Sequence, residues 1–136
     1  MRPLVFLLAA LAAAGCDSAL TDGQAFSATL STDKTAYALG ADATLRIENT
    51  GSVPIEFGPP SCWAALEAER TTGAWGEIAR PDRPTCGGAI VVLPAGETSM
   101  SPPIDLDVPA GTYRLLLNVS DGDEEVRLST DPFVVG

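Results

Sequence analysis

The side chains that most often carry enzyme chemistry are scarce in this sequence. It has no histidine, and Lys34 is its single lysine. A serine or cysteine nucleophile therefore lacks its usual general base. Lys34 lies in a turn rich in threonine and aspartate, with no serine nucleophile motif beside it. The sequence predicts a protein that is not an enzyme.

One short acidic segment could bind a cation. The run Asp121-Gly122-Asp123-Glu124-Glu125 offers the oxygen ligands that Ca²⁺ prefers, and Asp121, Asp123 and Glu124 are its weak candidate ligands. No EF-hand pattern surrounds them, and acidic turns that contain glycine are common between strands. We therefore favour a solvated turn, and the sequence predicts neither a metal nor another cofactor.

Two tryptophans and two arginines are the candidate binding residues. Trp63 and Trp75 flank a proline-rich segment that also carries Arg80 and Arg83. Rigid aromatic side chains on constrained loops make good binding anchors because they lose little conformational entropy. The alternative for the tryptophans is packing in the core, and the prolines that follow the arginines also fit a stiff spacer.

Residues 1–15 have the layout of a signal peptide. Met1-Arg2-Pro3 carries one positive charge, and residues 4–14 form an apolar run without a polar side chain. A helix needs about 20 apolar residues to cross a bilayer. This shorter run therefore predicts a cleaved export signal and not a permanent membrane span.

The residues at the end of this segment are Ala13-Ala14-Gly15-Cys16, which resemble the lipobox of bacterial lipoproteins. The resemblance implies cleavage before Cys16 and a lipid anchor on this cysteine, although Ala13 stands where a lipobox usually has leucine. Asp17 resembles the inner-membrane retention signal of enterobacterial lipoproteins. Because that signal varies between bacterial groups, inner and outer membrane both stay open, and an ordinary secretory signal is the alternative.

Removal of residues 1–15 leaves a strongly acidic chain of one domain. Seven basic and eighteen acidic residues remain, a formal charge of −11. Such a chain is poorly suited to binding nucleic acid or anionic lipid through a basic patch. Residues 16–24 are small and polar and predict an acylated tether of at most about 30 Å. Residues 25–136 are long enough for one independent core.

The two remaining cysteines, Cys62 and Cys86, predict a disulfide, because an exported chain meets an oxidising compartment. The bond would close a loop of about 25 residues and stabilise the fold by about 3 kcal/mol on the chain-entropy estimate. Two cysteines without a histidine make a poor zinc site.

Apolar and polar residues alternate along most of residues 25–135, which is typical of half-buried strands. The clearest strand carries Tyr113, Leu115, Leu117 and Val119 on one face, and we expect it to be central. With turns every 8–12 residues, the pattern predicts an antiparallel β-sandwich of about eight strands.

Two segments are harder to assign. Residues 61–70 fit both a helix and a strand, and we predict a strand that ends in a hairpin turn at residues 71–74. Met100, Ile104 and Leu106 are an even number of residues apart, so we expect them on the same face of an extended chain. The prolines between them predict a segment at a sheet edge.

Several loose motifs follow one another in a recognisable order: Tyr37-Ala38-Leu39-Gly40-Ala41-Asp42, Asn49-Thr50-Gly51, Pro94-Ala95-Gly96-Glu97-Thr98 and Gly111-Thr112-Tyr113-Arg114-Leu115. This order resembles the immunoglobulin-like domains of exported bacterial proteins. Related sandwiches include a bacterial proteinase inhibitor family, which would share the Asn-Thr-Gly turn, but no inhibitory motif is present. Tyr113 is similar to the tyrosine of an immunoglobulin-type corner, whose hydroxyl would bond to nearby backbone.

These features together predict a bacterial protein of the cell envelope, exported and anchored to a membrane by lipid, with its domain in the periplasm or at the cell surface. Its immunoglobulin-like sandwich would present loops to a protein or glycan partner. The alternatives are a proteinase inhibitor of the same fold and a structural envelope module, including one assisted by calcium.

Overall fold

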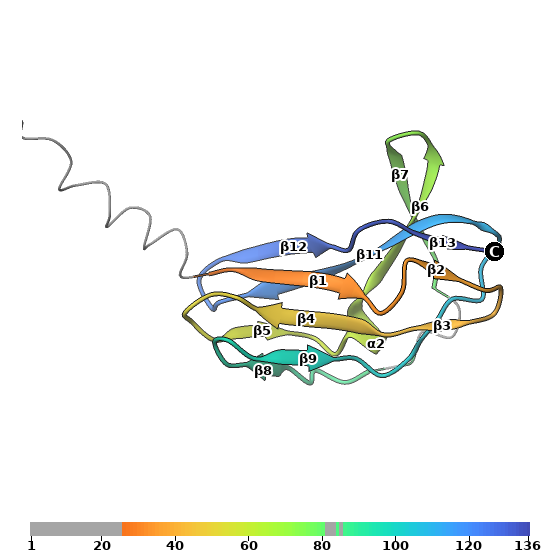
Figure 1. Cartoon of the computed structure of the whole chain (residues 1–136). Coiled ribbons are helices and arrows are strands. Elements are labelled where there is room, and N and C mark those ends of the chain that lie inside the picture. Colours follow the sequence, from red (N-terminus) through yellow and green to blue (C-terminus); the bar gives the residue numbers. More distant parts are fainter. Residues whose placement is uncertain (1–25, 81–83, 85) are drawn as a thin grey trace, which may run out of the picture.

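Short strands separated by turns run through the computed structural model, which describes residues 26–80, 84 and 86–136 (Figure 1). The predicted signal peptide, the tether with Cys16, and Arg83 lie outside the described residues. The strands form antiparallel sheets that face each other, and the only parallel pair is between two short strands among the described residues. The chain therefore has the antiparallel β-sandwich fold that the sequence predicts, with thirteen short strands among the described residues where about eight are expected.

One layer of the sandwich is built from a three-stranded sheet and a two-stranded sheet. The three strands lie in the order β1-β4-β9, and β3 pairs with β10, all antiparallel. Their bounds are β1 Ala28–Thr32, β3 Asp42–Ala43, β4 Leu45–Asn49, β9 Thr98–Met100 and β10 Ile104–Asp105.

The other layer is an eight-stranded sheet centred on β11 (Gly111–Ser120). β11 pairs with four strands, β12, β13, β5 and β6, which confirms the central position predicted for it. The other strands of this sheet are β2 Ala36–Tyr37, β5 Ile55–Phe57, β6 Ala65–Thr71, β7 Ala74–Ile78, β8 Val91–Leu93, β12 Glu125–Ser129 and β13 Phe133–Val135. β8 forms one edge of the sheet, since it pairs with β5 only.

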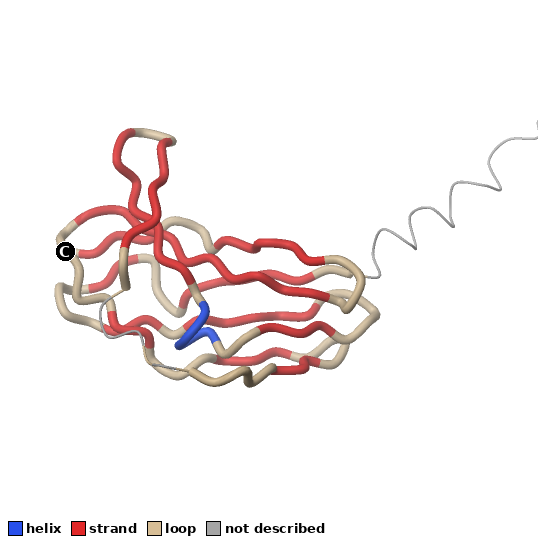
Figure 2. The backbone as a smooth tube through the Cα atoms, turned by 180° about the vertical axis from the view of Figure 1, so that it is seen from behind, coloured by secondary structure: helices blue, strands red, loops and turns tan. Residues whose placement is uncertain are grey.

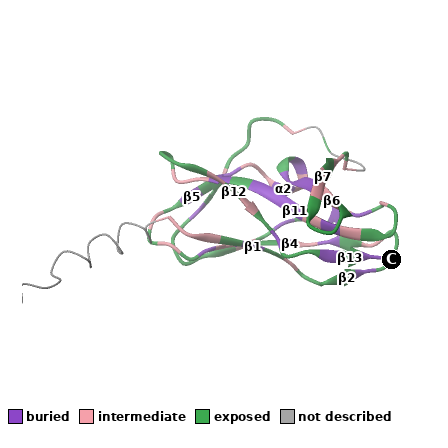
Figure 3. Cartoon of the chain, turned by 90° about the horizontal axis from the view of Figure 1, so that it is seen from above, coloured by how far each residue is buried: buried purple, intermediate pink, exposed green. Residues whose placement is uncertain are grey.

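The core lies between the two layers. Tyr113, Leu115, Leu117 and Val119 of β11 are all buried, as the alternation predicts, and they pack in one cluster with the inward-facing residues of the other layer. Burial of each such side chain contributes about 1.5–3 kcal/mol. In Figure 3, β11 is accordingly coloured as buried along much of its length, whereas the β6–β7 hairpin is intermediate or exposed beyond the buried start of β6.

The strand predicted for residues 61–70 is wrong in its first part. Pro60–Trp63 form a short helix, α2, and β6 begins only at Ala65 (Figure 2). The reason is the proline at the first turn of α2, because its fixed φ suits a helix start and it donates no backbone hydrogen bond to a strand. No helix in the described part of the chain is long and apolar enough to cross a membrane.

The hairpin turn predicted at residues 71–74 is confirmed. β6 and β7 pair in an antiparallel manner and stand out from the sandwich at the end that carries the C-terminus (Figures 1 and 2). Gly73 has a φ of +79°, a backbone conformation that residues with a Cβ rarely adopt.

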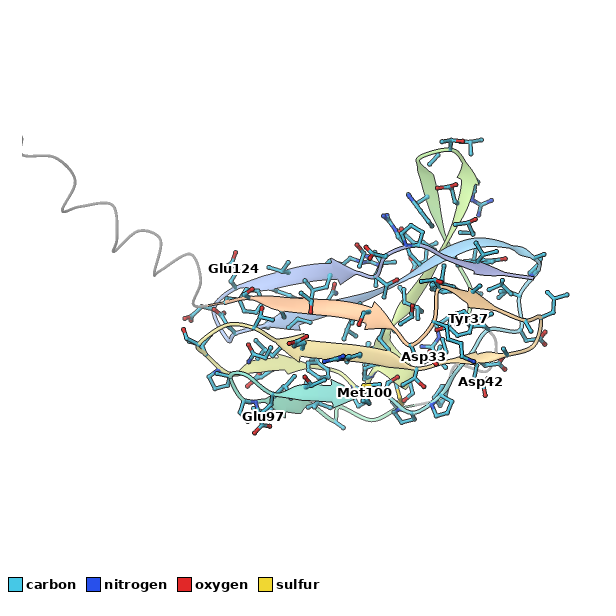
Figure 4. All side chains as sticks on the ribbon, viewed as in Figure 1. Asp33, Tyr37, Asp42, Glu97, Met100 and Glu124 are labelled. Atoms are coloured by element: carbon cyan, nitrogen blue, oxygen red, sulfur yellow. A yellow bond between two sulfur atoms is a disulfide. The ribbon has the colours of Figure 1, made fainter. Side chains whose placement is uncertain are left out.

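The prediction that Met100 lies on the same face as Ile104 and Leu106 is wrong. Met100 is 54% exposed (Figure 4), whereas Ser101 is buried and its Oγ accepts the Leu45 N–H at 2.9 Å. Two prolines follow, which cannot donate to a ladder, so the strand alternation breaks between β9 and β10. Ile104 and Leu106 turn inward independently of Met100. β9 does lie at a sheet edge, as predicted.

Two polar side chains hold the ends of the sandwich. The Tyr113 hydroxyl donates to the Pro109 carbonyl oxygen at 2.5 Å, which confirms the predicted tyrosine corner. Asn49, which the sequence assigns only to a turn, is fully buried. Its Nδ2 donates to the carbonyl oxygens of Val53 (2.8 Å) and Leu93 (3.0 Å), and its Oδ1 accepts the Gly51 N–H (3.1 Å).

Candidate binding surface

The surface around Trp63 originates in an interruption of the sheet. β5 pairs with β11 at Glu56 and Ser120, and β6 pairs with β11 at Ala65 and Leu116. Between these pairs β11 advances four residues, while the facing segment advances nine. The surplus residues cannot stay in the ladder, so they leave the plane of the sheet and form α2 with its flanking turns.

Covalent and hydrogen bonds hold α2 in place. Cys62 of α2 forms a disulfide with Cys86, as predicted, and this links α2 to the loop before β8. The Arg80 guanidinium donates to the carbonyl oxygens of Ser61 (2.7 Å), Ala64 (3.0 Å) and Pro60 (3.3 Å). These are carbonyls at the end of a helix, which need such donors. Arg80, predicted as a binding residue, is therefore engaged in supporting α2.

Trp63 is the exposed aromatic residue of this region. It is 55% exposed, so the alternative of core packing does not apply to it. Its indole lies against the backbone of Gly58: a Cβ at that position would be 2.3 Å from Cδ1 and 2.7 Å from Cγ of the ring. The missing side chain of Gly58 thus allows the ring to lie where it does.

A hollow of about 360 Å³ lies beside Trp63 on the outer face of the large sheet. Its lining comes from β5, β11, β12, Trp63 of α2 and the loop before β8. Trp63 and Ile90 are its exposed large apolar side chains, whereas Phe57, Leu117 and Val119 are buried. The titratable side chains that line it, among the described residues, are Glu56 and Glu125. The hollow is thus lined by both apolar and anionic side chains.

The register of four strands explains where the carboxylates lie. Val92, Glu56, Ser120 and Glu125 stand opposite one another on β8, β5, β11 and β12. Adjacent strands are about 4.8 Å apart, so the Glu56 and Glu125 backbones are roughly 10 Å apart with Ser120 between them. Both glutamates are exposed, as are Val92 (56%) and Ile90 (61%) at the sheet edge.

Trp75 lies in a different environment from Trp63. It is on the β6–β7 hairpin, where the Arg114 guanidinium carbon lies 4.4 Å from the centre of its ring. Arg114 also forms an ion pair with Glu67 at 2.7 Å. Trp75 is half-buried and does not line the hollow beside Trp63. Trp63 and Trp75, both predicted as binding residues, therefore do not lie in one site.

The acidic turn binds its own backbone. One carboxylate oxygen of Asp121 accepts the N–H groups of Glu124 (2.7 Å) and Asp123 (2.9 Å), and these two hydrogen bonds lower the pKa of Asp121. Glu124 points into solvent at the end of the sandwich (Figure 4). Within residues 26–80, 84 and 86–136, no group of three or more histidine, cysteine, aspartate or glutamate side chains is arranged to hold a metal ion.

Two other titratable side chains, Asp33 and Tyr37, form a hydrogen-bonded pair that joins β2 to the turn after β1 (Figure 4). The Tyr37 hydroxyl donates to Asp33 at 2.5 Å and accepts the Lys34 N–H at 3.0 Å, while Asp33 accepts the Thr44 N–H at 2.9 Å. Burial, followed by the bond to Asp33, raises the pKa of Tyr37 to about 12. Burial would raise the pKa of Asp33, but the hydrogen bonds from Tyr37 and Thr44 outweigh it and the pKa is lowered.

No family model matches the sequence, and no curated protein matches it. One similar solved structure is the CsuC–CsuE chaperone–tip adhesion subunit complex of Csu pili from Acinetobacter baumannii, with a TM-score of 0.46 and 14% identity over 79% of this chain and 56% of that chain. Another is the SafA pilin in complex with the SafB chaperone from Salmonella enterica, with a TM-score of 0.45 and 15% identity over 81% of this chain and 54% of that chain. This chain thus spans little more than half the length of either.

Proposed function

We propose that this protein is an exported, non-enzymatic binding module that is anchored to a membrane through lipid on Cys16. Its partner is a protein or glycan of the envelope or the extracellular space. The observation that carries the proposal is the exposed indole of Trp63, which lies beside a hollow and is held there by Gly58 and the neighbouring disulfide.

This arrangement has the properties of a binding anchor. Residues that dominate binding energy are enriched in tryptophan and lie in preformed sites, because a rigid side chain loses little entropy on association. Trp63 meets both conditions, and the exposed Ile90 and Val92 extend the apolar surface next to it. An apolar surface with a few placed polar groups is the usual composition of a ligand site.

The direction of the chain supports a domain that stands close to its membrane. β1 begins at the end of the sandwich that also carries the β11–β12 turn, while the β6–β7 hairpin and the C-terminus lie at the opposite end (Figure 1). A tether of residues 16–24 would span at most about 30 Å. A lipid on Cys16 would therefore place the end with the β11–β12 turn toward the membrane.

Fatty-acid labelling tests the anchor. A metabolic fatty-acid probe should label the wild-type chain and not the Cys16→Ser variant, which should appear in the soluble fraction. Equal labelling of both chains, or release of both to the medium, would refute the lipid anchor.

Site-specific photo-crosslinking tests the binding surface. A crosslinking amino acid at Ile90, next to the hollow, should capture a specific partner in cells, and one at Asp42, on the other layer, should not. Identical products at both positions, or none at Ile90, would refute binding at this surface. A panel of serine and cysteine proteases tests the alternative, since sub-micromolar inhibition would identify an inhibitor instead.

A further inference from the structure

We propose that the hollow beside Trp63 binds a basic side chain, an arginine or a lysine, from a partner protein. The inference rests on the proposed binding function and adds the chemistry of the ligand. Charge complementarity carries it: the titratable groups among the described lining residues are the carboxylates Glu56 and Glu125, and no basic residue is among them.

The carboxylates are placed so that one cation can approach both. Glu56 and Glu125 flank Ser120 on neighbouring strands and point to the same outer face of the sheet. Each is exposed, and within the described residues neither forms an ion pair. Arg127 lies two residues after Glu125 on β12, opposite Asn118 of β11, and lines a neighbouring hollow that shares Trp63 and Asn118 with this one. The two charges therefore face the hollow without a cation from the lining itself.

The apolar wall explains why a side chain suits the hollow better than a free cation. Lysine and arginine bury a hydrocarbon stem along apolar surface while the charged group stays in polar surroundings. Trp63 and Ile90 provide that surface, and the face of an indole also attracts a cation directly. The volume of about 360 Å³ is at the lower end of the range for ligand sites, which fits one long side chain and a neighbouring apolar residue.

The charge of the whole chain acts in the same direction. After removal of residues 1–15 the formal charge is −11, and a field of one sign raises the rate at which oppositely charged ligands arrive. Salt should therefore weaken binding through slower association. Exposed Ile90 and Val92 lie beside the glutamates at the sheet edge, so the partner segment should present apolar residues next to its basic residue.

Peptide titration of the full-length chain tests the proposal. The probes are fluorescent peptides with the sequence Arg-Leu-Arg-Leu-Arg, blocked at both ends, and the same peptide with glutamine in place of arginine. Fluorescence anisotropy should show binding of the arginine peptide and none of the glutamine peptide. Each surface carboxylate contributes modestly, so Glu56→Gln with Glu125→Gln should weaken binding about 10-fold. Trp63→Ala should weaken it at least as much.

Two further variants separate the site from general electrostatics and from loss of structure. Asp42→Asn with Asp131→Asn removes the same charge from exposed positions outside the hollow and should change affinity less than 3-fold. Gly58→Ala leaves every charge in place but displaces the indole, so it should weaken binding while the circular dichroism spectrum and the unfolding transition of the sandwich persist.

Equal weakening by the hollow variants and the control variants would overturn the proposal, because the interaction would then be non-specific. Failure of the arginine peptide to bind, or full binding by Trp63→Ala, would overturn it as well. If crosslinking at Ile90 captures a partner and the arginine peptide does not bind, the ligand chemistry is wrong while the binding function stands. If both experiments fail, both proposals fail.

Discussion

Asn49 offers the sharpest test of how this sandwich is held together. It is a fully buried polar residue on β4, and its side chain joins three backbone groups: the carbonyls of Val53 and Leu93 and the N–H of Gly51. These bonds connect β4 to the turn that follows it and, across the sandwich, to the end of β8. Asn49→Ala removes all three bonds and adds no new group.

The expected loss follows from which partners can reach water. Leu93 accepts in a buried bond, and leaving such an acceptor unpaired costs about 1–3 kcal/mol. The bonds to Val53 and Gly51 are partly buried, and losing each costs about 0.5–1.5 kcal/mol. The free energy of unfolding should therefore fall by about 4 kcal/mol, which is large against the 5–15 kcal/mol typical of a domain.

Asn49→Asp adds a test in which only one atom changes. The carboxylate still accepts the Gly51 N–H but faces two carbonyl oxygens, so burial and these acceptors should raise its pKa above the unfolded value of about 3.9. The folded state then binds more protons than the unfolded state, and stability should rise as the pH falls from 7 toward 4. Asn118→Asp, at the exposed asparagine of β11, is the matched control and should lack this dependence.

Urea unfolding followed by tryptophan fluorescence measures both effects. At a slope of about 1.5 kcal/mol/M, Asn49→Ala should lower the midpoint by roughly 2–3 M without a change of slope. A loss below about 1 kcal/mol, or the same pH profile for the aspartate variants at both positions, would show that Asn49 is not the connection we describe.

The remaining predictions concern other parts of the sandwich. The pKa of Tyr37 is about 12 in the folded state and about 10 in the unfolded state, so its contribution to the free energy of unfolding should be fully present below pH 10 and be lost as the pH rises to 12. Melting curves at alkaline pH should not show this loss in Tyr37→Phe. A loss that persists in this variant would contradict the assignment to Tyr37. Cys62→Ser with Cys86→Ser should lower the free energy of unfolding by about 3 kcal/mol in urea, whereas an unchanged midpoint would show that the disulfide does not constrain the unfolded chain. Tyr113→Phe removes the bond to the Pro109 carbonyl and should cost about 1 kcal/mol in the same assay, with no effect expected on peptide binding at the hollow.

The strands of this protein can be predicted from its sequence because the alternation of apolar and polar residues is a local property of the chain. Tyr113, Leu115, Leu117 and Val119 point to one side of an extended chain whatever lies around them, and burial of that side is enough to specify a central strand. The hairpin at Gly73 and the tyrosine corner are also local, since turn and partner lie within a few residues. The disulfide was predictable by elimination among few cysteines.

Met100 and residues 61–63 could not be assigned correctly from the same rules. In both places proline breaks the alternation, and the chain after the break can resume on either face. Which face it takes depends on distant residues: Ser101 turns inward to meet the Leu45 N–H, and α2 forms because β11 pairs on both sides of it. The prolines mark where the alternation breaks, but neither of these contacts with distant residues has a signal in the local sequence.

The sequence by itself determined most of the strand segments, the acidic character of the chain and the short list of candidate binding residues, because these depend on composition and local periodicity. Only the tertiary structure decided how those candidates are used. It directs Arg80 to the carbonyls of α2, covers Trp75 with Arg114 and leaves Trp63 exposed beside Glu56 and Glu125. The physical reason is that the exposure of a side chain depends on strand register and on where surplus residues between β5 and β6 leave the sheet. Both depend on pairing with β11, which is far away in the chain.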